Sequence, residues 1–126
     1  MDRAEKAVEF KRDRQRHNNC CQAVLMAFAD QVDLDEDQLR KLGAGFGGGM
    51  GNMEGTCGAL VAAEMLVGLM KFDQGPVRRD ARQIQESFTK QCGASLCKDL
   101  KGVTTGTMLC DCDDCVRAAV RLVEAL

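Results

Sequence analysis

The residues with the greatest capacity for chemistry in this chain of 126 residues are its eight cysteines. They occupy positions Cys20, Cys21, Cys57, Cys92, Cys97, Cys110, Cys112 and Cys115. The first residues are charged and lead into no apolar run, unlike a signal peptide, so we expect a cytoplasmic protein. In a reducing compartment, this cysteine count indicates metal, cluster or thiol chemistry rather than a disulfide framework.

Three cysteines are predicted to lie at or near the start of a helix. Cys57 directly follows a glycine-rich loop, and Cys97 lies near the start of a short helix. Cys112 follows Asp111, a good capping residue. The partial positive charge and free N–H groups of a helix N-terminus favour a thiolate over a thiol. These positions therefore suit metal ligands or reactive thiols.

A structural interpretation competes with the functional one at each cysteine, because a free cysteine is often a small core residue. For Cys21 and Cys92, taken singly, packing explains the residue at least as well as function does. Cys112 and Cys115 have the C-x-x-C spacing typical of metal and redox sites, but both also continue an apolar helical face. Eight cysteines, several of them at helix starts, exceed what packing alone requires.

Residues 43–55 contain seven of the 13 glycines. Successive backbone N–H groups in such a loop can surround an anionic sulfur or phosphate. The cofactor-binding candidates are Gly47, Gly48, Gly49 and Gly51. The loop formally matches G-x-G-x-x-G, but that dinucleotide motif must follow a strand, and here it follows a helix. A tight helix connection that needs positive φ angles is the alternative, although so many glycines favour close backbone approach to a site.

Two further residues could contribute chemistry. His17 is the only histidine, and we expect it to be an exposed neighbour of a cap, although its closeness to Cys20 leaves metal ligation open. Glu64 could be a buried carboxylate with a perturbed pKa. We expect Glu64 instead to reach an edge or to pair with one of three arginines, namely Arg78, Arg79 or Arg82.

The elements that must position these residues are helices. Apolar residues recur at helical spacing, and no segment alternates with period two. Helices are predicted over 3–16 and 20–32, and a short one begins after a cap within 33–37 and ends at Gly43. Further helices are predicted from Thr56 to about Met70, over 77–92, after Ser95, and from Asp111 to near the end. We predict an all-α fold: one domain spanning residues 1–126, a compact bundle of about six or seven helices in which the glycine-rich loop leads into a central helix.

Composition excludes two classes of partner. The net charge is −2, from 17 basic and 19 acidic residues, so no basic field exists to bind nucleic-acid phosphates. Trp and Tyr are absent, which leaves no stacking platform for bases. The longest apolar stretch, 59–70, is interrupted by Glu64 and is shorter than the ~20 residues that cross a membrane. We expect no nucleic acid and no membrane as partners.

The pattern of cysteines and glycines resembles a family of redox-active proteins named for its C_GCAxxG_C_C cysteine signature, with split-Soret cytochromes among its relatives. The resemblance runs from about Asn19 to the C-terminus. Its most specific part is the glycine loop followed by Thr-Cys-Gly-Ala at 56–59. The other matching segments are 19–24, 96–100 and 112–116.

The resemblance assigns the family's four cysteines to Cys20, Cys57, Cys97 and Cys112, and it leaves the other four as extras. It implies a small helical redox protein with an iron–sulfur centre, a homodimer, and a redox partner protein of unknown identity. A Cys-x-x-Cys-His motif is absent, because Val116 follows the last cysteine. We therefore expect no covalent haem.

Three functions follow, in order of preference. The first is electron transfer through an iron–sulfur cluster held by Cys20, Cys57, Cys97 and Cys112, with Cys115 as the reserve ligand. The second is a thiol–disulfide redox protein without metal, in which Cys57 is the low-pKa attacking thiol and Cys20 or Cys112 resolves the mixed disulfide. The third is a structural or interaction module with a four-cysteine zinc site.

Overall fold

The computed structural model describes residues 1–126 and confirms the all-α prediction. The α-helices are α1 (Arg3–Arg12), α2 (Cys20–Met26), α3 (Glu36–Gly43), α4 (Gly47–Met50), α5 (Gly58–Lys71), α6 (Arg78–Cys92), α7 (Cys97–Leu100) and α8 (Cys112–Glu124). Three short 3-10 helices are η1 (Ala29–Gln31), η2 (Ala44–Phe46) and η3 (Phe72–Gln74). Because α4 and α7 are single turns of four residues, six longer helices build the bundle.

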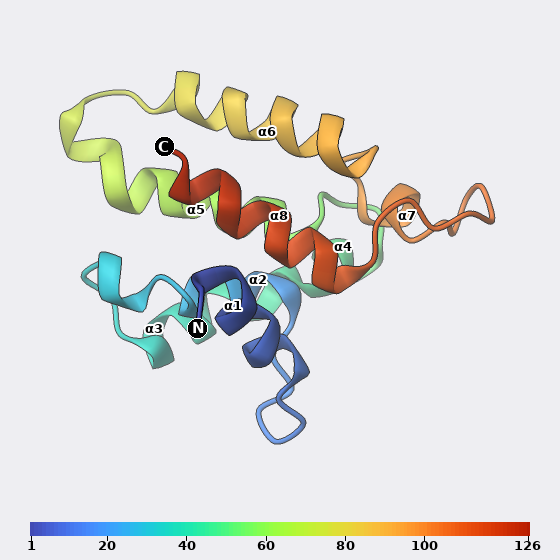
Figure 1. The fold of residues 1–126 in the computed structure, drawn as a ribbon, viewed down its shortest axis with the longest axis horizontal. Coiled ribbons are helices and arrows are strands. Elements are labelled where there is room, and N and C mark those ends of the chain that lie inside the picture. Colours follow the sequence, from blue (N-terminus) through green and yellow to red (C-terminus); the bar gives the residue numbers. More distant parts are fainter.

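Two helices, α5 and α8, lie side by side through the middle of the molecule (Figure 1). The α6 helix packs on both of them, while α1 packs on α8 and α2 packs on α5. The α5 helix is buried over most of its length, as predicted for a central helix. Fully buried side chains such as Phe28, Leu66 and Phe88 fill the core, and each stabilises the fold by roughly 1.5–3 kcal/mol through removal of apolar surface from water.

Two helices end earlier than their apolar pattern predicts. The first stops at Arg12 instead of residue 16, because Asp13 is extended and its carboxylate accepts the N–H groups of Gln15 and Arg16. The second stops at Met26, and the chain continues through η1. There Arg3 donates hydrogen bonds to the Ala27 carbonyl and to the Asp30 carboxylate, which stabilise the turn outside the helix.

Two predicted caps are replaced by backbone pairing. Instead of Thr56 and Ser95, the residues at the N-cap positions of α5 and α7 are Cys57 and Leu96, and neither makes a side-chain capping bond. Thr56 and Leu96 instead form an isolated antiparallel bridge. The Cys57 N–H donates to the Ser95 carbonyl at 2.8 Å. The starts of α5 and α7 are thus held together by the main chain, which brings two cysteines to one place.

None of the helices is both long enough and apolar enough to cross a membrane.

Candidate functional site: a cysteine centre where helix starts converge

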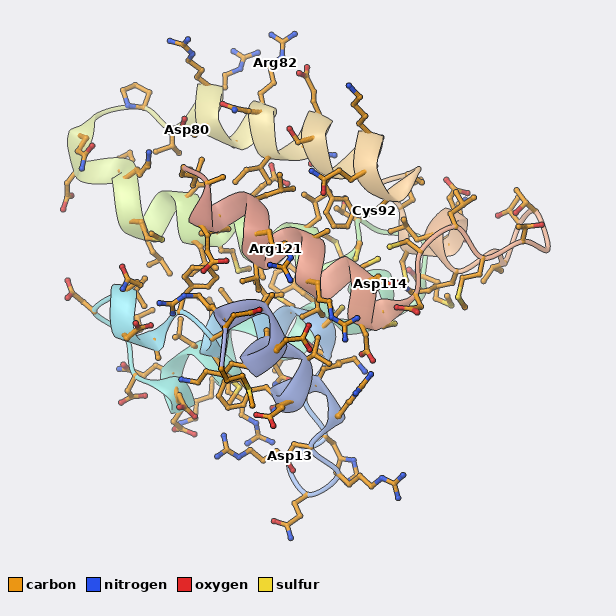
Figure 2. All side chains as sticks on the ribbon, viewed as in Figure 1. Asp13, Asp80, Arg82, Cys92, Asp114 and Arg121 are labelled. Atoms are coloured by element: carbon orange, nitrogen blue, oxygen red, sulfur yellow. The ribbon has the colours of Figure 1, made fainter.

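The cysteines gather at the end of the bundle where several helices begin. All eight are free thiols, and six of them are buried. Cys20 and Cys21 open α2, Cys57 precedes α5, and Cys97 opens α7. Cys92 ends α6, Cys110 lies just before α8, and Cys112 and Cys115 lie in its first turn. Figure 2 shows sulfur atoms beside the labelled Cys92, where α6 ends next to α7 and the start of α8.

A chain of sulfur contacts links cysteines from different helices. The Cys20 thiol contacts the Cys57 thiol, and Cys57 in turn contacts Cys115. The sulfurs of Cys92, Cys110 and Cys115 all lie within 4.8 Å of one another. We call these last three residues the three-cysteine cluster, and we call Cys20, Cys57, Cys97 and Cys112 the signature cysteines. The three-cysteine cluster has the spacing and donor chemistry to hold a metal ion.

One cation, Lys101, lies among the sulfurs. Its Nζ donates to the Cys110 carbonyl at 3.1 Å and lies 3.7 Å from the Cys115 sulfur. Burial alone would lower the pKa of Lys101, but the neighbouring sulfurs of Cys115, Cys112 and Cys57 outweigh it and hold that pKa above its ordinary value. Lys101 therefore stays charged and offsets negative charge that develops on the sulfurs.

The Cys57 thiol differs from the expected low-pKa nucleophile. Its contact with the Cys115 thiol, together with burial, raises the pKa of Cys57 to about 11. The opposing effects, from the Cys20 thiol and the Leu60 N–H in the first turn of α5, are smaller. The favourable field of the helix N-terminus is thus outweighed, because the sulfur is buried against other sulfurs. Without a metal, this residue is a thiol at neutral pH.

The other buried cysteines follow the same rule. The contact with Cys57 and then burial raise the pKa of Cys20, and burial raises the pKa of Cys21 to about 12. Burial likewise raises the pKa of Cys110 to about 11, and it raises the pKa of Cys92. Metal binding at these positions must therefore displace protons.

The glycine-rich loop is a left-handed turn that lies against the site. Gly48, Gly49 and Met50 have φ angles of 58°, 59° and 63°. A Cβ atom on Gly49 would lie 2.5 Å from the Cβ of Cys97, so only glycine permits this contact. The close backbone approach predicted from the glycine run is therefore an approach to Cys97. Cofactor binding by the amides of this loop stays a prediction.

A second glycine contact positions α2. A Cβ atom on Gly47 would lie 2.6 Å from the side chain of Asn19. Asn19 forms a capping box with Gln22 at the start of α2, and it also donates to the carbonyl oxygens of Gly43 and Ala44. The loop thereby fixes the helix start that carries Cys20.

The predicted site residues are brought to one region in different degrees. Cys20, Cys57 and Cys115 are in contact through their sulfurs. Cys97 lies against Gly49, and Cys112 lies beside Lys101. Which of these five residues ligate a metal stays a prediction.

Sequence reasoning missed three members of the site. Cys92 and Cys110 were treated as extras, yet both join Cys115 in the three-cysteine cluster. Lys101 had one usable signal, because it stands four residues after Cys97 and so shares its helical face. Cys110 had none, because its position depends on a return of the chain in which its N–H bonds to the Leu100 carbonyl at 3.2 Å.

The remaining candidates lie apart from the sulfurs. His17 is exposed, with a φ angle of 54°, as expected for a neighbour of the cap. Glu64 is half-buried and forms no salt bridge, so the predicted pairing with an arginine is wrong; Arg82 pairs with Glu86 instead. Burial raises the pKa of Glu64, which agrees with the alternative of a perturbed carboxylate.

Comparison with known proteins gives the family. The family model described as "Putative redox-active protein (C_GCAxxG_C_C)" matches residues 18–126, a range that includes every cysteine and the glycine-rich loop. No curated protein and no solved structure matches the chain. The chain belongs to the C_GCAxxG_C_C family of redox-active proteins.

Proposed function

We propose that this protein transfers electrons through an iron–sulfur cluster held by cysteine thiolates. The observation that carries the proposal is the convergence of free thiols, all but Cys112 buried, from the starts of α2, α5, α7 and α8 on one region next to Lys101. Membership of a redox-active family supports the same class of function.

The donor set fits such a group. Iron–sulfur clusters are usually held by four cysteine thiolates, and the signature cysteines supply four from separate helix starts. The signature cysteines offer only thiolate donors, and so does the adjoining three-cysteine cluster, the group whose spacing suits a metal ion. Soft thiolate ligands select iron–sulfur clusters, zinc or monovalent copper. The proposed ligands are Cys20, Cys57, Cys97 and Cys112, with Cys115 in reserve.

The cluster, when bound, supplies reversible one-electron chemistry. The chain's own residues hold it and set its environment. Lys101 offsets part of the thiolate charge, while the N–H groups of Ala59 and Leu60 act on the Cys20 and Cys57 sulfurs in the direction that stabilises negative charge. Cys112 is partly exposed, so this edge of the centre lies close enough to the surface to serve a redox partner protein.

A metal-free thiol–disulfide function is the second candidate, favoured by the direct contact between the Cys20 and Cys57 thiols. In that reaction the two thiols would give two protons and two electrons to a disulfide-containing or quinone-like acceptor and form one disulfide. The raised pKa of Cys57 weighs against it, because the thiolate is the attacking species.

The test is the iron and acid-labile sulfide content of protein purified without oxygen, together with its visible spectrum. We expect iron with matching sulfide in the wild-type protein. Cys20→Ser and Cys57→Ser should lose both. Cys21→Ala is the matched control, because Cys21 is also buried and is adjacent to Cys20 but is not a proposed ligand.

Other outcomes would reassign the function. A colourless protein that contains zinc would make this a structural zinc module. A colourless protein without metal would overturn the cluster and leave the thiol–disulfide function, which alkylation of Cys57 as a function of pH would then test.

A further inference from the structure

We propose that the three-cysteine cluster is a second metal site, separate from the centre of the signature cysteines, and that it binds a divalent thiophilic cation such as Zn²⁺. None of its members, Cys92, Cys110 and Cys115, belongs to the four cysteines that the family signature assigns. Three of the four extra cysteines nevertheless meet at one point, with every sulfur within 4.8 Å of the other two.

The geometry is close to that of a thiolate metal site. A Zn–S distance of about 2.3 Å in tetrahedral coordination places sulfurs about 3.8 Å apart. The sulfurs of the cluster need only small side-chain rotations to reach that spacing.

Each ligand is held by a different part of the backbone. Cys92 ends α6, directly before Gly93, whose φ angle of 97° closes that helix. Cys115 lies in the first four residues of α8, which the Asp111 side chain caps through the Asp114 N–H at 2.7 Å. Cys110 is held by the bond of its N–H to the Leu100 carbonyl. Anchoring on separate rigid elements preorganises the three donors.

The local charge selects a divalent ion. Three thiolates carry three negative charges, and the Lys101 ammonium, 3.7 Å from the Cys115 sulfur, offsets one of them. The two charges that remain match a divalent cation. Asp111 and Asp114 at the start of α8 add to the negative field around the cluster, although Asp114 is paired with Arg117 at 2.9 Å.

The cluster is open on one side. Cys92 and Cys110 line an open pocket of about 480 Å³, bounded on its polar side by Asp111 and Asp114. Cys115 lies on the inner side and is fully buried. A metal ion can therefore enter through the pocket and retain a fourth position for water or a small thiol, as zinc sites with three protein ligands do.

The two centres adjoin where Cys57 lies against Cys115 and near Cys92, and Lys101 neighbours sulfurs of both. Cys92 and Cys110 contact each other and Cys115, while Cys20 contacts Cys57. Substitution of Cys92 or Cys110 should therefore affect only the second site, and substitution of Cys20 only the first. Substitution of Cys115 should affect both.

The experiment measures Zn²⁺ bound per chain by equilibrium dialysis and elemental analysis, on reduced protein purified without oxygen. We expect one tightly bound Zn²⁺ in the wild-type protein and in Cys21→Ala and Cys20→Ser. Cys92→Ser and Cys110→Ser should bind it at least ~10-fold more weakly, since even loss of a group that only supports a ligand costs that much. Their iron and sulfide content should equal that of the wild-type protein.

A measurement on the wild-type protein avoids the folding of the variants. Alkylation with iodoacetamide, followed by mass spectrometry of the peptides, should show that Zn²⁺ protects Cys92 and Cys110. Absence of Zn²⁺ binding, or equal alkylation with and without Zn²⁺, would overturn the second site.

The outcomes separate this inference from the proposed redox function. Loss of iron and sulfide in Cys92→Ser would make the three-cysteine cluster part of the iron–sulfur centre and would overturn the second site alone. Zinc binding that depends on Cys92 and Cys110, in a protein that contains no iron, would overturn the redox function and support the second site.

Discussion

Two regions of this bundle, its apolar core and its cysteine end, are stabilised in different ways. Around the middle of α5, α6 and α8, fully buried apolar side chains such as Leu66, Phe88 and Val120 hold the helices together. At the cysteine end, α5 and α7 begin without a side-chain cap, and the preceding loop runs through a left-handed turn. At α5, α7 and the glycine loop the site thus departs from local rules of backbone stability, and functional sites are where such departures are expected.

The helices that carry cysteines differ in how they are capped. The α2 and α8 helices each have a capping side chain, Asn19 and Asp111, immediately before their cysteines. At α5 the position of the cap is occupied by Cys57 itself. A cysteine there gives up a stabilising hydrogen bond, and its sulfur becomes available to neighbouring sulfurs. Metal binding is the interaction that would restore the lost stability.

The largest effect should come from the core. Phe88→Ala should lower the free energy of unfolding by ~3–5 kcal/mol, because it removes a fully buried ring and leaves a cavity. Denaturant unfolding measures this change. Iron per folded chain should stay at the wild-type value, since Phe88 is not a candidate ligand; selective loss of iron from folded protein would contradict the separation of core and site.

Metal removal should act mainly at the cysteine end. Chelation under reducing conditions should lower the midpoint of thermal unfolding, with a loss of ~2.7 kcal/mol if the metal is present at 100 times its dissociation constant. Hydrogen exchange should accelerate in residues 43–57 and in α7, while the middle of α5 and α6 stays protected. Uniform acceleration over the whole chain would show that the apolar core and the cysteine end are not independent.

A matched pair of glycines tests the contact between loop and site. Gly48 and Gly49 have nearly equal φ angles of 58° and 59°, but only Gly49 lies against Cys97. Gly48→Ala should cost ~1–2 kcal/mol of stability from the left-handed conformation alone. Gly49→Ala should cost more, and it should also reduce the iron content because Cys97 must move. Equal iron content in the two variants would remove Cys97 from the proposed ligand set.

The smallest effect should come from Glu64 in the core helix. Burial raises the pKa of its carboxyl, so the folded state binds more protons than the unfolded state just above pH 4.5. Its contribution to stability is therefore lost as the pH rises through the raised pKa. Glu64→Gln should be more stable than the wild-type protein at pH 7 and equal to it near pH 4, as measured by urea unfolding; the opposite order at pH 7 would refute this sign.

The apolar core could be predicted from the sequence more fully than the site. The final helix was predicted from Asp111 and its apolar face, and the structure places Val116, Val120 and Val123 in the core. The central position of α5 followed from its nearly continuous apolar residues. These features depend on neighbours three or four residues apart, which a sequence displays directly.

The site depended on contacts between distant segments. The caps at Thr56 and Ser95 were wrongly predicted, because the two segments around them pair with each other instead. The role of Cys110 depends on a return of the chain to Leu100, and no local pattern signals such a return. The cysteine types and the helix starts were thus predictable, but their grouping into a three-cysteine cluster was not.

An iron–sulfur centre at the signature cysteines is tested by a redox titration of protein purified without oxygen, followed by visible absorption and electron paramagnetic resonance. The proposed function predicts a reversible one-electron change whose amplitude follows the iron content and is absent from Cys57→Ser. A protein that shows no reversible absorption change, or a change that survives in Cys57→Ser at full amplitude, would contradict an iron–sulfur centre at the signature cysteines.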